Sequence, residues 1–154
     1  MALKIVLVRH GEAKSKKSGQ TDHERELTKR GAEALRDAYP KTFSLVEPTL
    51  ASELWVSTAT RARQTADIAN ETLGIETVHL RDSLYEQDHQ AFLDDVSQTN
   101  ADLVVVVGHI PFMEDACYHL TGTSLGFSAG AAAAIEQPEH GRGRLLWFVQ
   151  GPEC

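Results

Sequence analysis

The stretch LVVVV at residues 103–107 gives the clearest indication of a β-strand in this sequence. Its five residues are all apolar, and four of them are β-branched valines, which favour extended backbone. An apolar run without alternating polar residues indicates a strand that is covered on both faces, as in a parallel sheet flanked by helices. The run therefore predicts a central parallel strand in an α/β protein.

Strand and helix patterns alternate along the rest of the chain. Short apolar runs predict strands at residues 3–8, 54–56, 77–80, 131–135 and 145–149. Apolar residues at helical spacing predict helices at residues 27–40, 59–73 and 90–97, and one that opens at Pro111. Pro40 is expected to end the first helix, and the last two strands are expected to form a hairpin. The alternation predicts one domain over residues 1–154, a three-layer α/β sandwich whose mostly parallel sheet has helices on both faces.

Composition excludes several classes of function. The formal net charge of −7 argues against nucleic-acid binding, which needs an excess of Lys and Arg. The apolar run at residues 3–8 is too short for a signal peptide, and no run approaches the ~20 apolar residues that span a bilayer. Cys117 and Cys154 are expected to be reduced thiols, the first buried on a helix and the second in the tail. The sequence thus predicts a cytoplasmic protein without membrane contact.

Polar clusters follow three of the predicted strands at the point where each strand ends. The tetrapeptide RHGE occupies residues 9–12, the segment STATR occupies residues 57–61, and His109 follows the run LVVVV and a glycine. Ligands of parallel α/β sheets gather beyond the carboxyl ends of the strands, so we expect the three clusters to lie together. Imidazole can attack phosphorus, and guanidinium donors match phosphate oxygens. The clusters therefore indicate phosphoryl chemistry.

Each cluster also has a simpler interpretation when it is taken alone. Ser57 is expected to cap the helix that follows, which places Arg61 near a helix N-terminus that favours anions, but the segment is also compatible with an ordinary capped helix carrying exposed arginines. A protonated His109 can bind a phosphoryl oxygen, but a lone histidine at a strand end usually makes a structural hydrogen bond. The other histidines lack the spacing of metal ligands and are expected to be structural or exposed: His23, His79, His89, His119 and His140.

Four motifs together resemble the histidine phosphatase superfamily, the phosphoglycerate-mutase-like group. RHGE at residues 9–12 matches its Arg-His-Gly-Glu signature, and residues 61–66 match its Arg-Ala-x-Gln-Thr-Ala helix motif. LTKRG at residues 27–31 resembles its Leu-Thr-x-x-Gly helix start, and residues 108–109 match its Gly-His. The motifs occur in the family's order and cover essentially the whole chain, which makes the combination far more specific than any one motif.

The resemblance implies a mechanism and a set of site residues. It implies that His10 is the nucleophile and forms a phosphohistidine intermediate, without a metal or another cofactor. It implies a cationic pocket of Arg9, Arg61 and His109, with Ser57 as a weaker phosphate contact. For the general acid, Glu86 is the candidate and Asp88 the reserve, while a solvated acidic loop is the alternative for this segment.

The short segments between the predicted elements indicate an open site. In this respect the chain resembles SixA-type phosphohistidine phosphatases, which implies a protein partner phosphorylated on histidine. Lys14, Lys16 and Lys17 would steer an acidic partner or simply keep the loop soluble. The alternatives are a small-molecule phosphomonoesterase for sugar or nucleotide phosphates, with the same His10 chemistry, and a non-catalytic phosphate-binding module. A monomer is favoured.

Overall fold

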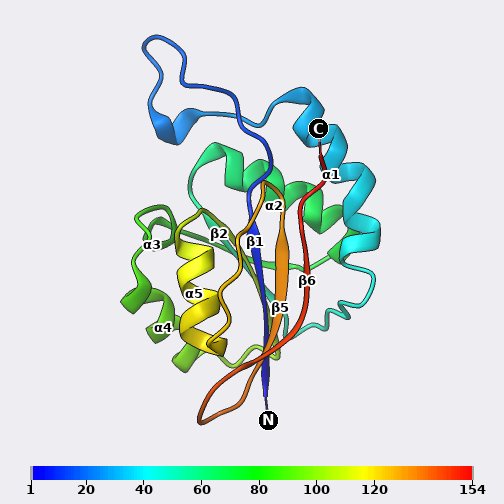
Figure 1. Ribbon diagram of the computed structural model, residues 1–154, viewed down its shortest axis with the longest axis vertical. Helices are drawn as coiled ribbons and strands as arrows, with labels where there is room; N and C mark the ends of the chain where they lie inside the picture. The colour runs from blue at the N-terminus through cyan, green and yellow to red at the C-terminus, as the bar shows by residue number, and fades with distance from the viewer. Residues whose placement is uncertain (1, 154) are drawn as a thin grey trace.

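A six-stranded mixed sheet forms the centre of the computed structural model, which describes residues 2–153 (Figure 1). Its strands are β1 (Leu3–Arg9), β2 (Glu53–Ser57), β3 (Thr77–Arg81), β4 (Leu103–Gly108), β5 (Ala132–Gln137) and β6 (Arg144–Val149). They lie side by side in the order β3-β2-β4-β1-β5-β6. Strands β1 to β4 are mutually parallel, and β5 pairs antiparallel with both β1 and β6. The predicted mostly parallel sheet and the predicted hairpin are confirmed.

Helices cover both faces of this sheet (Figure 1). They are α1 (Lys29–Thr42), α2 (Thr60–Leu73), α3 (Asp82–Tyr85), α4 (His89–Gln98) and α5 (Phe112–Thr121), with a short 3-10 helix η1 (Asp22–Glu24) in the first long loop. Val105 and Val107 pack in one core cluster with side chains of α1 and α2, whereas Val104 and Val106 pack in a second cluster with side chains of α4 and α5. The run LVVVV is therefore covered on both faces, as its composition predicts.

The first helix differs from the prediction at both ends. It begins at Lys29 rather than Leu27, because the Thr28 hydroxyl accepts a hydrogen bond from the Gly31 N–H (2.9 Å) and so caps the helix. The prediction that Pro40 ends the helix is wrong, since the helix continues to Thr42. Pro40 lies in the last turn, where its missing N–H removes only one intrahelical hydrogen bond before the helix ends.

Three further observations bear on the sequence predictions. Helix α3 was not predicted, because its four residues are too few to show a helical period. Cys117 is a free thiol buried on α5, as expected, whereas Cys154 lies outside the described residues. Among the helices of residues 2–153, none combines the length and the apolar sequence that a membrane-spanning helix needs.

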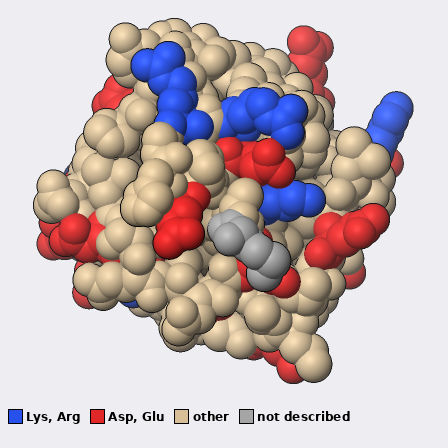
Figure 2. Space-filling view, turned by 90° about the horizontal axis from the view of Figure 1, so that it is seen from below, with Lys and Arg blue, Asp and Glu red and all other residues tan. Residues whose placement is uncertain are grey.

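The carboxyl ends of β1, β2 and β4 lie at one end of the sheet, which is also where the loop carrying η1 projects (Figure 1). The three polar clusters of the sequence all leave the sheet at this end. The opposite end of the molecule shows Lys and Arg interspersed with Asp and Glu, without a large patch of one sign (Figure 2). The carboxyl end of the sheet is therefore where a functional site is to be sought.

Candidate active site

The backbone of His10 is fixed from two sides. Its N–H donates to the carbonyl of Gly108 (2.9 Å), and its carbonyl accepts from the N–H of Gly130 (2.9 Å). Its Nδ1 lies 2.7 Å from the carbonyl oxygen of Gly11. A carbonyl can only accept, so Nδ1 carries the hydrogen, and the lone pair of the neutral ring is on Nε2. This tautomer leaves the lone pair of Nε2 free of an attached hydrogen.

The surroundings of His10 keep its ring uncharged. Burial lowers the pKa of His10 to about 4, and the positive charges of Arg61, Arg9 and Arg25 act in the same direction. The hydrogen bond to Gly11 opposes this shift. At neutral pH the imidazole therefore has a free lone pair, which attack on phosphorus requires.

This depressed pKa is directly measurable. In a proton NMR titration, we expect the His10 ring signal, assigned by its loss in His10→Ala, to have its midpoint near pH 4. The ring is neutral above its pKa and protonated below it, so the signal should stay constant between about pH 7.5 and 5.5. A midpoint near the ordinary histidine value of about 6.5 would contradict the environment described for this ring.

Arg9 and Arg61 lie beside this ring and have incompletely satisfied guanidinium groups. Arg9 Nη1 donates to the Phe127 carbonyl (2.8 Å). Arg61 is only 6% exposed. Its Nη1 donates to the Asp22 carbonyl (2.8 Å), and its Nη2 donates to Asp22 Oδ2 (3.1 Å). The Nε atoms of both arginines are buried without a hydrogen-bond partner within residues 2–153. Buried donors of this kind indicate unused capacity to bind an anion.

The ring of His109 lies next to that of His10, with 5.2 Å between the ring centroids. His109 Nε2 is 2.7 Å from the hydroxyl of Ser57. Burial lowers the pKa of His109 to about 3, and the neighbouring His10 ring and the positive charge of Arg61 act in the same direction. The ring is therefore neutral in the free protein, and a bound phosphoryl dianion would favour its protonation.

Ser57 does not cap α2, so that prediction is wrong. It is the last residue of β2, and Ala59 occupies the N-cap position of α2 without a side-chain hydrogen bond. The strand extends one residue further than the sequence indicates, which directs the Ser57 hydroxyl to His109. Ser57 thus orients one of the candidate site residues.

The remaining motif residues hold these side chains in place. The Thr65 hydroxyl accepts from the Gly11 N–H (3.0 Å) and donates to the Arg61 carbonyl (2.8 Å), which ties the loop after β1 to α2. Gln64 Oε1 accepts from the Leu27 N–H (2.7 Å). The helix motif at residues 61–66 is therefore a set of contacts that position the site.

The two motifs at residues 9–12 and 27–31 contact each other directly. The Glu12 carboxylate accepts from the Thr28 hydroxyl (2.8 Å) and from Arg30 Nε (2.7 Å). A Cβ atom at Gly31 would lie 2.8 Å from the Glu12 carbonyl oxygen, so only glycine fits there without movement. These contacts fix the loop that carries His10 against the start of α1.

Sequence reasoning missed Asp22, Arg25 and Tyr85. The Asp22 carboxylate accepts from Arg25 Nη1 (3.0 Å) as well as from Arg61, and from the Tyr85 hydroxyl (2.9 Å). Hydrogen bonding by Arg25, then by Tyr85 and Arg61, holds the pKa of Asp22 well below its usual range. The sequence signal at Asp22 and Arg25 was the density of charge in DHERE at residues 22–26, and Tyr85 carries no comparable signal.

Glu86 and Asp88 make no hydrogen bond to the residues around His10. Glu86 is exposed at the end of α3. Asp88 caps α4 by accepting from the Ala91 N–H (3.1 Å). Tyr85, the neighbour of Glu86, is the residue of this segment that reaches Asp22. The general-acid role of Glu86 stays a prediction. Within residues 2–153, no three His, Cys, Asp or Glu side chains are grouped as metal ligands.

The model of the histidine phosphatase superfamily (branch 1) matches residues 5–93 of this chain. The chain belongs to the histidine phosphatase superfamily. It is accordingly a phosphatase, and its sheet and helices form the phosphoglycerate-mutase-like α/β fold. A search among curated protein sequences gives no significant match.

Solved structures of similar proteins share this histidine phosphatase fold over nearly the whole chain. A protein from Agrobacterium tumefaciens, provisionally named as the phosphohistidine phosphatase SixA, is 25% identical, with a TM-score of 0.82 over 97% of this chain and 98% of that one. A similarly named protein from Nakamurella multipartitia is 26% identical, with a TM-score of 0.80 over 98% and 97% of the two chains. The protein histidine phosphatase SixA complexed with tungstate is 22% identical, with a TM-score of 0.81 over 96% and 97%.

Proposed function

We propose that this phosphatase is a single-domain, cytoplasmic enzyme that removes phosphate from histidine side chains of other proteins. The observation that carries the proposal is the tautomer of His10, whose Nδ1 is held by the Gly11 carbonyl so that Nε2 is free to attack. Arg9, Arg61 and His109 would bind the equatorial phosphoryl oxygens, and Ser57 would hold His109 with a weaker contact to phosphate. No metal is needed for these steps.

The proposed reaction has two displacements at phosphorus. The lone pair of His10 Nε2 forms a bond to phosphorus, the bond from phosphorus to the substrate imidazole breaks, and its electron pair stays on that imidazole. Water then attacks the phosphorylated His10, the N–P bond breaks, and its pair returns to Nε2 with release of phosphate. Both transition states spread negative charge over three oxygens, which the cationic side chains stabilise.

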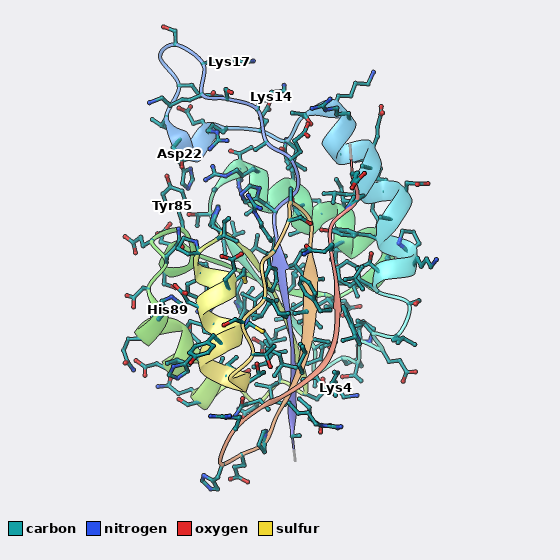
Figure 3. All side chains as sticks on the ribbon, viewed as in Figure 1. Lys4, Lys14, Lys17, Asp22, Tyr85 and His89 are labelled. Carbon is teal, nitrogen blue, oxygen red and sulfur yellow. The ribbon has the colours of Figure 1, made fainter. Side chains whose placement is uncertain are left out.

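Two features support a phosphorylated side chain as substrate rather than an enclosed small molecule. Asp22 and Arg25 form the rim of the site, and this rim is accessible because their side chains are 49% and 28% exposed, respectively. Lys14 and Lys17 lie along the loop that rises above Asp22 and Arg25 (Figure 3). Lys14 pairs with Glu26 (3.4 Å), and the other lysines of this loop suit an acidic protein partner. The fold itself also serves small molecules, as in mycobacterial glucosyl-3-phosphoglycerate phosphatase, which is 16% identical.

A substrate panel tests the proposal. We expect the purified protein, with a metal chelator present, to dephosphorylate a histidine-phosphorylated peptide with a higher kcat/KM than any sugar or nucleotide phosphate. Imidazole is a better leaving group than an alkoxide, and the open rim admits a protein segment. Preference for a sugar or nucleotide phosphate would show a small-molecule phosphomonoesterase instead, and loss of activity in the chelator would contradict the metal-free mechanism.

A further inference from the structure

The carboxylate of Asp22 has acceptor capacity beyond its three hydrogen bonds. Oδ2 accepts from Arg61 and Tyr85, and Oδ1 accepts from Arg25 within the described residues. An ionised carboxylate offers about four acceptor positions, so Oδ1 can accept one more hydrogen bond. The Asp22 side chain is 49% exposed, which leaves this position accessible to a bound molecule.

Asp22 and Tyr85 lie close to the two histidine rings of the site. The side chain of Asp22 points from the loop above the sheet toward Tyr85 of α3 (Figure 3). The Tyr85 ring lies 5.7 Å from the His109 ring, which itself lies 5.2 Å from the His10 ring. In-line transfer places the leaving group on the far side of phosphorus from the nucleophile. With the phosphoryl group between the His10 ring and Asp22, the leaving group would lie beside the loop and α3.

The charge of Asp22 fits one kind of leaving group. Its three donors hold the carboxylate ionised, so Asp22 is an acceptor and not a source of protons. An alkyl or aryl ester presents no donor at its leaving oxygen. The imidazole of phosphohistidine, when protonated on the ring nitrogen that is not bonded to phosphorus, presents an N–H and a positive charge.

We propose that Asp22 is a specificity-determining residue that binds the substrate imidazole, with Oδ1 accepting a hydrogen bond from the ring N–H that is not attached to phosphorus. This inference rests on the proposed function. As His10 attacks, the substrate N–P bond breaks and its electron pair stays on the ring. The proton on the other nitrogen remains, so the group departs as neutral imidazole. Asp22 thereby favours the form of the substrate that needs no general acid.

The test compares two substrates in Asp22→Asn. We expect kcat/KM for a histidine-phosphorylated peptide to fall roughly 10-fold to 100-fold relative to kcat/KM for 4-nitrophenyl phosphate, the loss typical of a hydrogen bond to a charged group. Any misplacement of Arg61 lowers both values and leaves their ratio unchanged. Glu24→Gln is the matched control, since within residues 2–153 this carboxylate of the same short helix bonds only to Thr21. It should preserve the ratio.

A pH profile gives a second readout. Asp22 stabilises the protonated imidazole of the substrate. As the pH is raised, kcat for the phosphopeptide should therefore begin to fall at a lower pH in Asp22→Asn than in the wild type. If Asp22→Asn does not fold, Tyr85→Phe is the second variant. It removes the hydrogen bond that orients the Asp22 carboxylate, so it should weaken the contact with the substrate ring and shift the ratio in the same direction by a smaller factor. Equal losses on both substrates, or no loss, overturn this inference alone. If the wild-type protein cleaves 4-nitrophenyl phosphate but no histidine-phosphorylated peptide, both this inference and the proposed function are overturned.

Discussion

Replacement of His10 by alanine is expected to lower kcat by on the order of 10³-fold or more with every phosphorylated substrate. The variant lacks the only atom proposed to bond covalently to phosphorus, and water cannot take its position between Arg9 and Arg61 with comparable orientation. Initial rates with a histidine-phosphorylated peptide and with 4-nitrophenyl phosphate measure the loss. Rapid quenching with radiolabelled substrate should trap acid-labile phosphate on the wild-type protein and none on His10→Ala.

The control for this experiment is His119→Ala. His119 is an exposed histidine on α5, so its removal should change neither the rate nor the trapped phosphate. Circular dichroism of both variants checks that the fold is retained. Turnover by His10→Ala at the wild-type rate would refute the assigned nucleophile.

Replacement of Arg61 by alanine is expected to lower kcat/KM by about 10³-fold, a factor typical of an arginine that stabilises a phosphoryl transition state. Arg61 is nearly buried and its Nε has no partner within residues 2–153, so its charge acts at short range in a poorly solvated site, beside its ion pair with Asp22. Its loss also leaves the Asp22 carboxylate with fewer donors beside the position of the phosphate. The variant should therefore bind phosphate and vanadate weakly as well.

Arg61→Ala carries an independent signature in the titration of His10. The charge of Arg61 contributes to the low pKa of His10, so its removal should move the His10 NMR midpoint to higher pH. Arg63→Ala is the matched control, because Arg63 lies on the same helix and is exposed. It should preserve both the rate and the midpoint. An Arg61→Ala variant with normal kcat/KM would remove this side chain from the proposed mechanism.

The sequence predicted the buried strand correctly, because its apolar side chains have to be covered by other elements. The unbroken apolar run at residues 103–107 required cover on both faces, and the structure supplies it from α1 and α2 on one side and α4 and α5 on the other. The sequence predictions failed at short range, at Pro40 and Ser57, where a single hydrogen bond or one added strand residue decides where an element begins or ends.

The α/β class, the order of the motifs and the end of the sheet at which their polar residues emerge can all be read from the amino-acid pattern. Each of these follows from hydrophobic period or from chain direction, which are local properties. The tautomer of His10 and the contacts of Asp22 depend on the folded chain, because Arg61 and Tyr85 are 39 and 63 residues away from Asp22 in sequence. Polar side chains in an irregular loop carry no period, so their partners are set by how the loop folds back over the sheet.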